Sequence, residues 1–244
     1  MGRKKPAVSD DELFKIWSDW VEKIHHETVS LAHNLQMFRR IAEMFNENKR
    51  LRKVGGDLWD WLSRNYVAAA AMSLRRELDK RAGAKNLRHL LHDIEGRPTV
   101  LSRERYEAMW PLNGADSKAR EFQAMRRDRS FNRFQLVKNP RDSALDHIDP
   151  NMVKADLNNL SAETEKVRAY IEKAVAHRME SPVASVTFDE FDAAVDAVQK
   201  MIKKYYLLLT QTSVARFEPV PQCDIDAPFR FPWLPAKRRG RTRR

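Results

Sequence analysis

The sequence is poor in the residues that make tight turns and covalent cross-links. Its 244 residues include 7 glycines and 11 prolines, which is few for a many-stranded sandwich or barrel. The single cysteine, Cys223, excludes an internal disulfide framework and a cysteine-rich zinc site, so we expect a reducing, cytoplasmic location. No apolar run approaches the roughly 20 residues of a membrane-spanning helix, and we expect no membrane partner.

Most familiar catalytic signatures are also missing. The chain has no glycine-rich phosphate loop, no nucleophile-elbow serine and no zinc-type His/Glu motif on a helix, so no metal or cofactor is expected. His89 and His92 are three residues apart, but two ligands do not make a selective metal site. His26 and His33 share one face of an expected helix and are interpreted as surface or packing residues.

Positive charge is concentrated at the two ends of the chain. The net charge is +11, and residues 229–244 contain seven cations and no acid, while Arg3, Lys4 and Lys5 add three more. The residues between these ends are therefore nearly neutral. Basic tails commonly bind nucleic acid by counterion release, although a solubilising tail has the same composition. The RNA-binding candidates are Lys237, Arg238, Arg239, Arg241, Arg243 and Arg244.

Apolar residues recur mostly at steps of three and four, which predicts an all-α protein. We expect a single helical bundle of five to seven helices with long antiparallel helices and basic flexible tails. The expected domains are an N-terminal tail at 1–8, the bundle at 9–213, and a Pro-punctuated extended segment with a basic tail at 214–244. Capping boxes at Ser9/Glu12 and Thr187/Glu190 mark two helix starts. The expected main helices are 9–48, 57–81, 151–179 and 187–212, with shorter helices near 87–94, 102–110 and the start of 116–140.

Helix ends, caps or breaks are expected at three further places. The polar and basic stretch from Asn46 to Lys53 should break the first helix before the glycine pair that follows it. Asp57 should cap the second long helix. A break is also expected near Asn158 and Asn159, inside the helix at 151–179.

Two short stretches combine a histidine with nearby cations. Arg141 and His147 bracket five residues in a Pro-flanked stretch, and Lys173 precedes His177 and Arg178 near the end of the expected helix 151–179. A histidine of near-neutral pKa beside a fixed cation can perform acid–base chemistry on a phosphodiester. The plain alternatives are a histidine at a helix C-terminus that contacts the last carbonyls, and a turn histidine before a proline.

Several segments resemble the HEPN superfamily of helical-bundle proteins, in the branch of abortive infection and toxin–antitoxin systems. Residues 17–46 resemble its long first helix, and residues 74–94 resemble its second and third helices. Residues 173–178 and 186–206 look like its closing histidine motif and last helix. The resemblance covers roughly residues 10–212.

The superfamily motif is an arginine, four to six residues and a histidine, usually Arg-polar-Lys-x-x-Ala-His. Lys173 and His177 match this form, but Ile171 stands where the arginine is expected, and Arg141…His147 fits the spacing without the Lys and Ala-His context. An arginine near His177 would then come from Arg178 or from a partner subunit.

The resemblance implies metal-independent RNA cleavage by a homodimer in phage defence, with a cognate antitoxin as a further partner in a toxin–antitoxin system. The implied catalytic residues are His177 first and His147 second, with Arg141, Lys173 and Arg178 as cations. The alternatives are a non-catalytic HEPN-like dimerisation or interaction module, and a helical scaffold with no nucleic-acid role.

Overall fold

The computed structural model describes residues 8–81, 83–110, 116–135, 145–176 and 185–231. Over these residues the chain is all-α, as expected, with one isolated bridge between Ser102 and His147 and no strand. Eight α-helices are present in this part, and seven of them have at least seven residues. They are α1 (Asp10–Glu47), α2 (Lys49–Val54), α3 (Gly56–Leu78), α4 (Leu87–Gly96), α5 (Arg103–Met109), α6 (Ser117–Asn132), α7 (Pro150–Tyr170) and α8 (Phe188–Thr210).

The helix beyond the expected five to seven is α2, which forms where a break was expected. Asn48 ends α1, and its side chain accepts hydrogen bonds from the backbone N–H groups of Arg50 and Leu51, so one residue ends one helix and caps the next. The basic stretch therefore continues as a short helix. Gly55 then closes the turn, because a Cβ there would lie 2.7 Å from the Leu51 carbonyl oxygen and 2.9 Å from the Phe45 ring.

The expected end of the first helix is confirmed at Glu47, whereas two other expected features of the helices were wrong. Helix α3 begins at Gly56 after Gly55 as N-cap, so the expected cap at Asp57 lies inside its first turn. Helix α7 runs without a break through Asn158 and Asn159. The two capping residues Ser9 and Thr187 are confirmed, and Thr187 forms the complete reciprocal box with Glu190.

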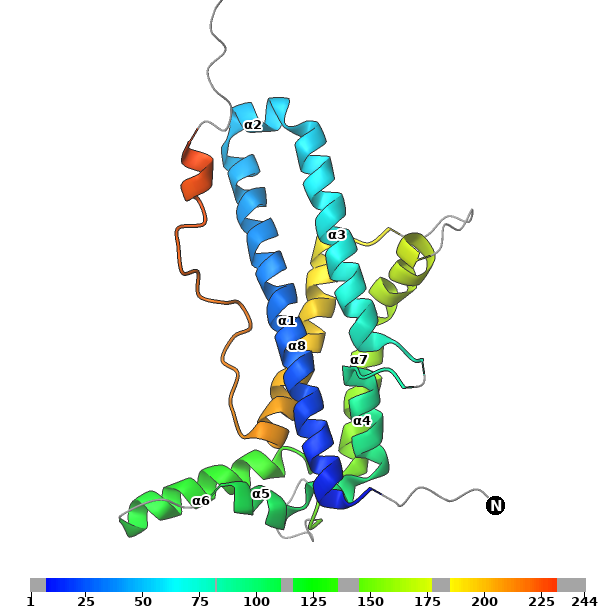
Figure 1. The fold of residues 1–244 in the computed structure, drawn as a ribbon, viewed down its shortest axis with the longest axis vertical. Helices are drawn as coiled ribbons and strands as arrows, with labels where there is room; N and C mark the ends of the chain where they lie inside the picture. The colour runs from blue at the N-terminus through cyan, green and yellow to red at the C-terminus, as the bar shows by residue number, and fades with distance from the viewer. Residues whose placement is uncertain (1–7, 82, 111–115, 136–144, 177–184, 232–244) are drawn as a thin grey trace, which may run out of the picture.

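Helices α1 and α3 form a long antiparallel hairpin with α2 at its tip, and α8 and α7 lie behind and beside it (Figure 1). Helix α8 packs against both α1 and α7, and α4 packs against α7. The core is made by the inward faces of these helices, with the side chains of Trp17, Leu74, Ile94 and Tyr205 fully buried. Helices α1, α3, α4, α7 and α8 thus each bury an apolar stripe against at least one neighbour.

A buried polar contact fixes α7 against α8. The carboxylate of Asp156 on α7 accepts hydrogen bonds from the Tyr205 hydroxyl at 2.8 Å and from the Lys204 ammonium at 2.5 Å. Burial, with the Asp156 charge, raises the pKa of Tyr205 well above its usual value, so the phenol stays a donor. Since this carboxylate has two donors on one helix, the register of α7 on α8 is specified.

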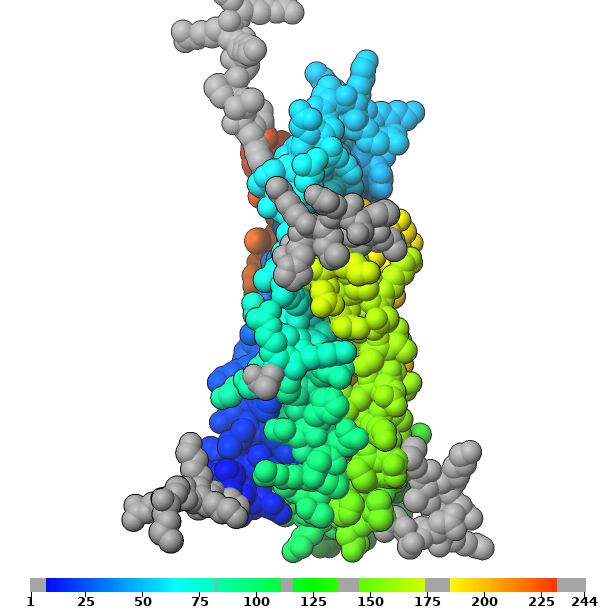
Figure 2. All heavy atoms as spheres, turned by 90° about the vertical axis from the view of Figure 1, so that its right-hand side faces the viewer, coloured from blue at the N-terminus to red at the C-terminus, as the bar shows by residue number. Residues whose placement is uncertain are grey.

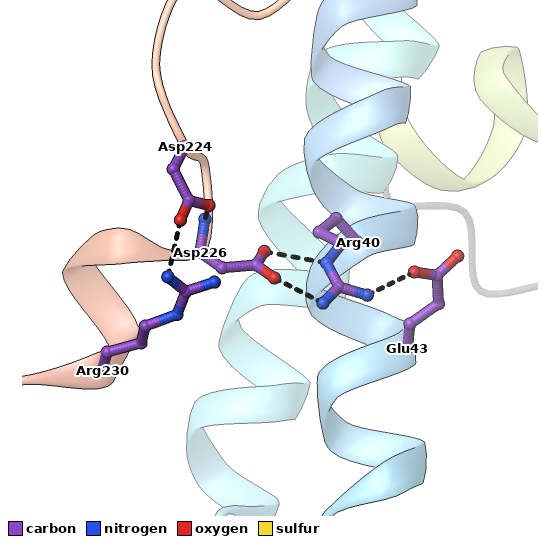
Figure 3. Close-up of polar contacts among 5 residues, drawn as sticks. All are labelled: Arg40, Glu43, Asp224, Asp226 and Arg230. Carbon is purple, nitrogen blue, oxygen red and sulfur yellow. Dashed lines mark hydrogen bonds and ion pairs between the residues drawn. The ribbon is translucent and has the colours of Figure 1, made fainter.

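The segment after α8 runs back along α1 as an extended strap (Figure 1). Gln211 ends α8 in the left-handed conformation at φ 59°, and Phe217 is buried with its ring 5.6 Å from that of His25. Figure 3 shows the far attachment: Arg40 on α1 holds Asp226 through two hydrogen bonds of 2.8 and 2.5 Å. The hydrogen bond from Arg40 lowers the pKa of Asp226, so both partners of this ion pair are charged at neutral pH.

None of the helices in the described ranges has the length and apolar character to cross a membrane. The base of the bundle carries α5 and α6, and α6 extends sideways from it (Figure 1).

Candidate active site

The end of α7 changes geometry where the predicted histidine motif begins. Helix α7 ends at Tyr170, and residues Ile171–Ala176 continue as a π-helix. Single π-helical turns within a helix are frequent at functional sites, because they re-aim the side chains that follow them. His177 comes directly after this turn in the chain, and both His177 and Arg178 lie outside the described residues.

The position that the resemblance assigns to arginine belongs to the core. Ile171 is 2% exposed and packs with the core side chains, whereas Lys173 two residues on is exposed. Tyr170 places its ring edge-on against Phe191 of α8, at 6.0 Å between centroids. Because Ile171 fills a packed position at the edge of the core, an arginine there would displace core packing, and we expect a guanidinium that serves this end of α7 to come from another position.

Such guanidinium groups line a hollow beside the π-helix. A cavity of about 390 Å³ lies between the end of α7 and the end of α3, on the face that Figure 2 shows. Its acidic lining residues are Asp79 and Glu172. Its other lining residues are the cations Arg75, Lys80, Arg81 and Arg168 and the apolar Leu78 and Ile171. The hollow is therefore cationic on balance.

Two of these cations form no close ion pair in the described part of the chain, although Lys80, after Arg168, contributes to lowering the pKa of Glu165. Arg168 donates a 2.6 Å hydrogen bond to Glu165, and Arg81 lies 3.6 Å from Asp79. Arg75 and Lys80 form no ion pair within the described ranges. Sequence reasoning missed Arg75, Lys80 and Arg81 as site residues, because they are about ninety residues away from the motif and no spacing rule links them to it.

A buried carboxyl group holds the lining segment after α3 in place. Glu77 is 4% exposed, and its Oε2 accepts a 3.0 Å hydrogen bond from the backbone N–H of Leu87, the first residue of α4. Burial raises the pKa of Glu77 to about 7, while the nearby Glu27 adds repulsion and Arg76 opposes it. Glu77 thus ties the end of α3 to the start of α4 and fixes both ends of the loop that carries Lys80 and Arg81.

His147 lies at the other end of α7. Its carbonyl oxygen accepts a 2.7 Å hydrogen bond from the Gln135 side chain, and its Nδ1 lies 2.7 Å from the Ile148 carbonyl, which makes Nδ1 the donor. Helix α7 has 21 residues and is therefore about 30 Å long. His147 and Lys173 consequently belong to two separate places on one chain, and Arg141 lies outside the described residues.

The comparison with models of protein families shows which family the chain belongs to. The model of the HEPN_AbiU2 family (AbiU2) matches residues 14–223. The chain belongs to the HEPN_AbiU2 family. This is the AbiU2 branch of abortive infection within the HEPN superfamily, so the resemblance drawn from the sequence is confirmed. No curated protein and no solved structure matches the chain.

The HEPN_AbiU2 match extends past α8 into the strap. It ends at Cys223, eight residues before the last residue that the structure describes. The matched part includes Phe217, which packs into the core beside His25. The helices, the hollow and most of the strap therefore belong to the same family unit.

The remaining histidines do not assemble into a site. The Nδ1 of His89 lies 3.0 Å from the Asn86 side chain, and the Nδ1 of His92 lies 3.3 Å from Glu95. His26 and His33 are exposed on α1. Among the described residues no three His, Cys, Asp or Glu side chains are placed to hold a metal ion. The basic tail from Lys237 to Arg244 lies outside the described residues.

The raised pKa of Glu77 predicts a stability profile that falls with pH. The folded-state pKa is about 7 against an ordinary value of 4.5, so the protonated form favours folding below pH 4.5 and this contribution is lost as the pH rises through 7. At about 1.4 kcal/mol per unit, the loss approaches roughly 3 kcal/mol. Glu77→Gln keeps the acceptor for Leu87 without a charge, so it should flatten the fall between pH 5 and 8.

Thermal or urea unfolding at several pH values measures this, with Glu47→Gln on the exposed end of α1 as the matched control. The control should follow the wild-type profile. Parallel profiles for wild type and Glu77→Gln would contradict the assignment.

Proposed function

We propose that the protein is a metal-independent endoribonuclease of a phage-defence system, acting as a homodimer, with His177 as its general acid or base. The observation that carries this proposal is the cationic hollow beside the π-helix, in a HEPN_AbiU2 chain whose motif histidine comes directly after that π-helix. A toxin–antitoxin setting, with a cognate antitoxin as partner, is the other context open to the same chemistry.

The chemistry uses the ribose itself as the nucleophile. Removal of the proton from a 2′-hydroxyl lets its oxygen attack the adjacent phosphorus, and the bond to the 5′-oxygen breaks as that oxygen takes up a proton. The products are a 2′,3′-cyclic phosphate and a 5′-hydroxyl. A histidine can perform either proton transfer. The cations Arg75 and Lys80 of the hollow, with Lys173 and Arg178, would stabilise the negative charge that develops on the phosphate oxygens.

The homodimer is supported by an exposed apolar stripe on α3. Leu58, Trp61 and Met72 are 49%, 61% and 51% exposed, and Ala68 and the polar Asn65, whose side chain donates to the Trp61 carbonyl, lie between them on the same face. Arg75, which lines the hollow, follows Met72 by one helical turn. A second copy packed along this stripe would bury the apolar side chains and bring the two hollows close to the interface.

Loss of the motif histidine should abolish RNA cleavage without loss of the fold. A positioned general acid or base is worth about 10²–10⁴-fold in rate, so His177→Ala should reduce cleavage of RNA and cell toxicity by at least that order. His26→Ala on the exposed face of α1 is the matched control and should retain activity. His147→Ala should weaken cleavage less, because its Nδ1 already bonds the Ile148 carbonyl.

Gel assays of labelled RNA, with circular dichroism as the check on folding, measure these effects. Chelators should leave the wild-type rate unchanged. Equal activity of the His177→Ala variant and the wild type would contradict the assignment of the acid–base group.

The second candidate function is a non-catalytic HEPN-like dimerisation and interaction module. The burial of Ile171 at the usual arginine position is the observation that favours it. A wild-type dimer that leaves a broad range of RNAs intact, but still binds them, would select this alternative.

The dimer has its own test in Trp61→Glu. A charge in the middle of the apolar stripe should convert a dimer to a monomer, because a buried unpaired carboxylate is costly. Light scattering coupled to size exclusion gives the mass directly. The control is Val220→Glu, since Val220 is 57% exposed on the strap, away from α3. A wild-type protein that is monomeric, or a Trp61→Glu variant that stays dimeric, would rule out this interface.

A further inference from the structure

Helix α6 carries more cations than any other helix that the structure describes, and it stands away from the bundle (Figure 1). It has 16 residues and carries five cations, Lys118, Arg120, Arg126, Arg127 and Arg129, against the two acids Glu121 and Asp128. Within the described residues, the contacts of α6 with the rest of the chain come from its last turns. Phe131 is buried, and Asn132 accepts a 2.8 Å hydrogen bond from Arg103.

Among the residues that the structure describes, none packs on the first turns of α6 in a way that explains their sequence. Phe122 and Met125 are 56% and 60% exposed, and Lys118, Arg120 and Arg126 are exposed as well. A helix of this length is marginal in water without tertiary contacts, and repulsion between its cations weakens it further. A polyanionic partner would relieve that repulsion.

The cations of α6 are arranged in a line. Lys118, Phe122, Arg126, Arg129 and Arg133 follow one another at steps of four, four, three and four, so they share one face of the helix and its C-cap. The Arg126 guanidinium lies 5.9 Å from the centre of the Phe122 ring. The line therefore offers successive positive charges with one exposed aromatic face among them.

This line leads into a cationic hollow on α8. A cavity of about 640 Å³ lies between the end of α6 and α8, and its cationic lining residues are Arg133, Lys200, Lys203 and Lys204. Asp196 is the one acid among its described lining residues. Lys203 donates a 3.0 Å hydrogen bond to the Ala215 carbonyl, and Lys204 bonds Asp156, so these two ammonium groups are held in place.

The other two cations of the hollow are free for a ligand. Arg133 and Lys200 are exposed and form no ion pair within the described ranges. Arg129 is also exposed and has no ion pair within the described ranges. The three cations together extend the positive surface from α6 onto the bundle.

We propose that the α6–α8 face, defined as Lys118, Arg126, Arg129, Arg133 and Lys200, binds the phosphate backbone of a nucleic acid. Lysine and arginine along a track, with an aromatic ring for base stacking, is the composition of sequence-tolerant single-strand binding surfaces. The choice of RNA as the ligand rests on the proposed function. This face is distinct from the hollow at the end of α7. Helix α6 extends from the opposite end of α7, about 30 Å away, while Lys200 lies one helical turn closer to the hollow than Lys204, which bonds Asp156 near the start of α7.

The separation gives the α6–α8 face a defined role. A short RNA can reach the catalytic end or the α6–α8 face but cannot span both, whereas a long RNA can occupy the two at once. The second contact then acts at a high effective concentration and raises the affinity for long RNA selectively. The face would therefore select substrates by length rather than by sequence.

The test is a triple variant, Arg129→Gln/Arg133→Gln/Lys200→Gln, of the full chain. The matched control, Arg50→Gln/Arg52→Gln/Lys53→Gln, removes the same charge from exposed residues of α2. Fluorescence anisotropy measures the binding of labelled single-stranded RNAs of about 3 and about 30 nucleotides, so that only the second is long enough to span both sites. The salt dependence of each affinity is recorded.

We expect the triple variant to lose roughly tenfold or more in affinity for the long RNA, with the slope of log affinity against log salt flatter by about 2. Its affinity for the short RNA should change less, and the control should bind both as the wild type does. Equal losses of RNA affinity in the two triple variants, or no loss in either, would overturn the proposal. The proposal would also fail if the triple variant bound an acidic polypeptide more weakly than the wild type does but bound RNA equally well.

Separate measurements of RNA binding and RNA cleavage distinguish a failure of this inference from a failure of the proposed function. If RNA stays intact but the α6–α8 variant binds it more weakly than the control does, the face is real and the nuclease assignment fails. If RNA is cleaved and the variant binds it as the control does, the nuclease assignment stands and the α6–α8 face is not a binding site.

Discussion

The packing of α8 between α1 and α7 is the constraint that positions every functional feature of this chain. Helix α8 contacts both neighbours along their length, and its buried residues lie on most of its circumference. Asp156 then fixes α7 along α8 through two donors. Because α7 is held in this way, one of its ends carries the π-helix and the motif, and the other carries His147 and the base from which α6 extends.

Ile171 belongs to the hydrophobic core and also occupies the position of the arginine in the superfamily motif. A side chain that is 2% exposed contributes to packing, so the site cannot use this position for the guanidinium found in the superfamily motif. The hollow offers the cations Arg75 and Lys80 instead, and it lies beside the π-helix Ile171–Ala176. Catalysis would then depend on cations supplied by α3, whose position depends in turn on the buried contact between Glu77 and the start of α4.

Helix periodicity and capping chemistry were enough to predict most of the fold. The four long helices, the caps at Ser9 and Thr187 and the family resemblance came from local patterns, which need no knowledge of tertiary contacts. Helix α2 was missed because its polar composition resembles a loop, and only the double role of Asn48 makes it a helix. The hollow could not be predicted, because Arg75 and Arg168 meet only after α3 packs beside the end of α7. Periodicity says which face is apolar but not which neighbour covers it.

The chemical nature of the RNA ends tests the central claim most directly. Wild-type protein is incubated with RNA in the presence of a chelator, and the new ends are characterised by mass spectrometry. A histidine mechanism with the ribose as nucleophile predicts 2′,3′-cyclic phosphate and 5′-hydroxyl ends. It also predicts no cleavage of the same sequence when every ribose lacks its 2′-hydroxyl. Ends with a 5′-phosphate and a 3′-hydroxyl, or cleavage that the chelator abolishes, would contradict a histidine mechanism that uses the ribose as nucleophile.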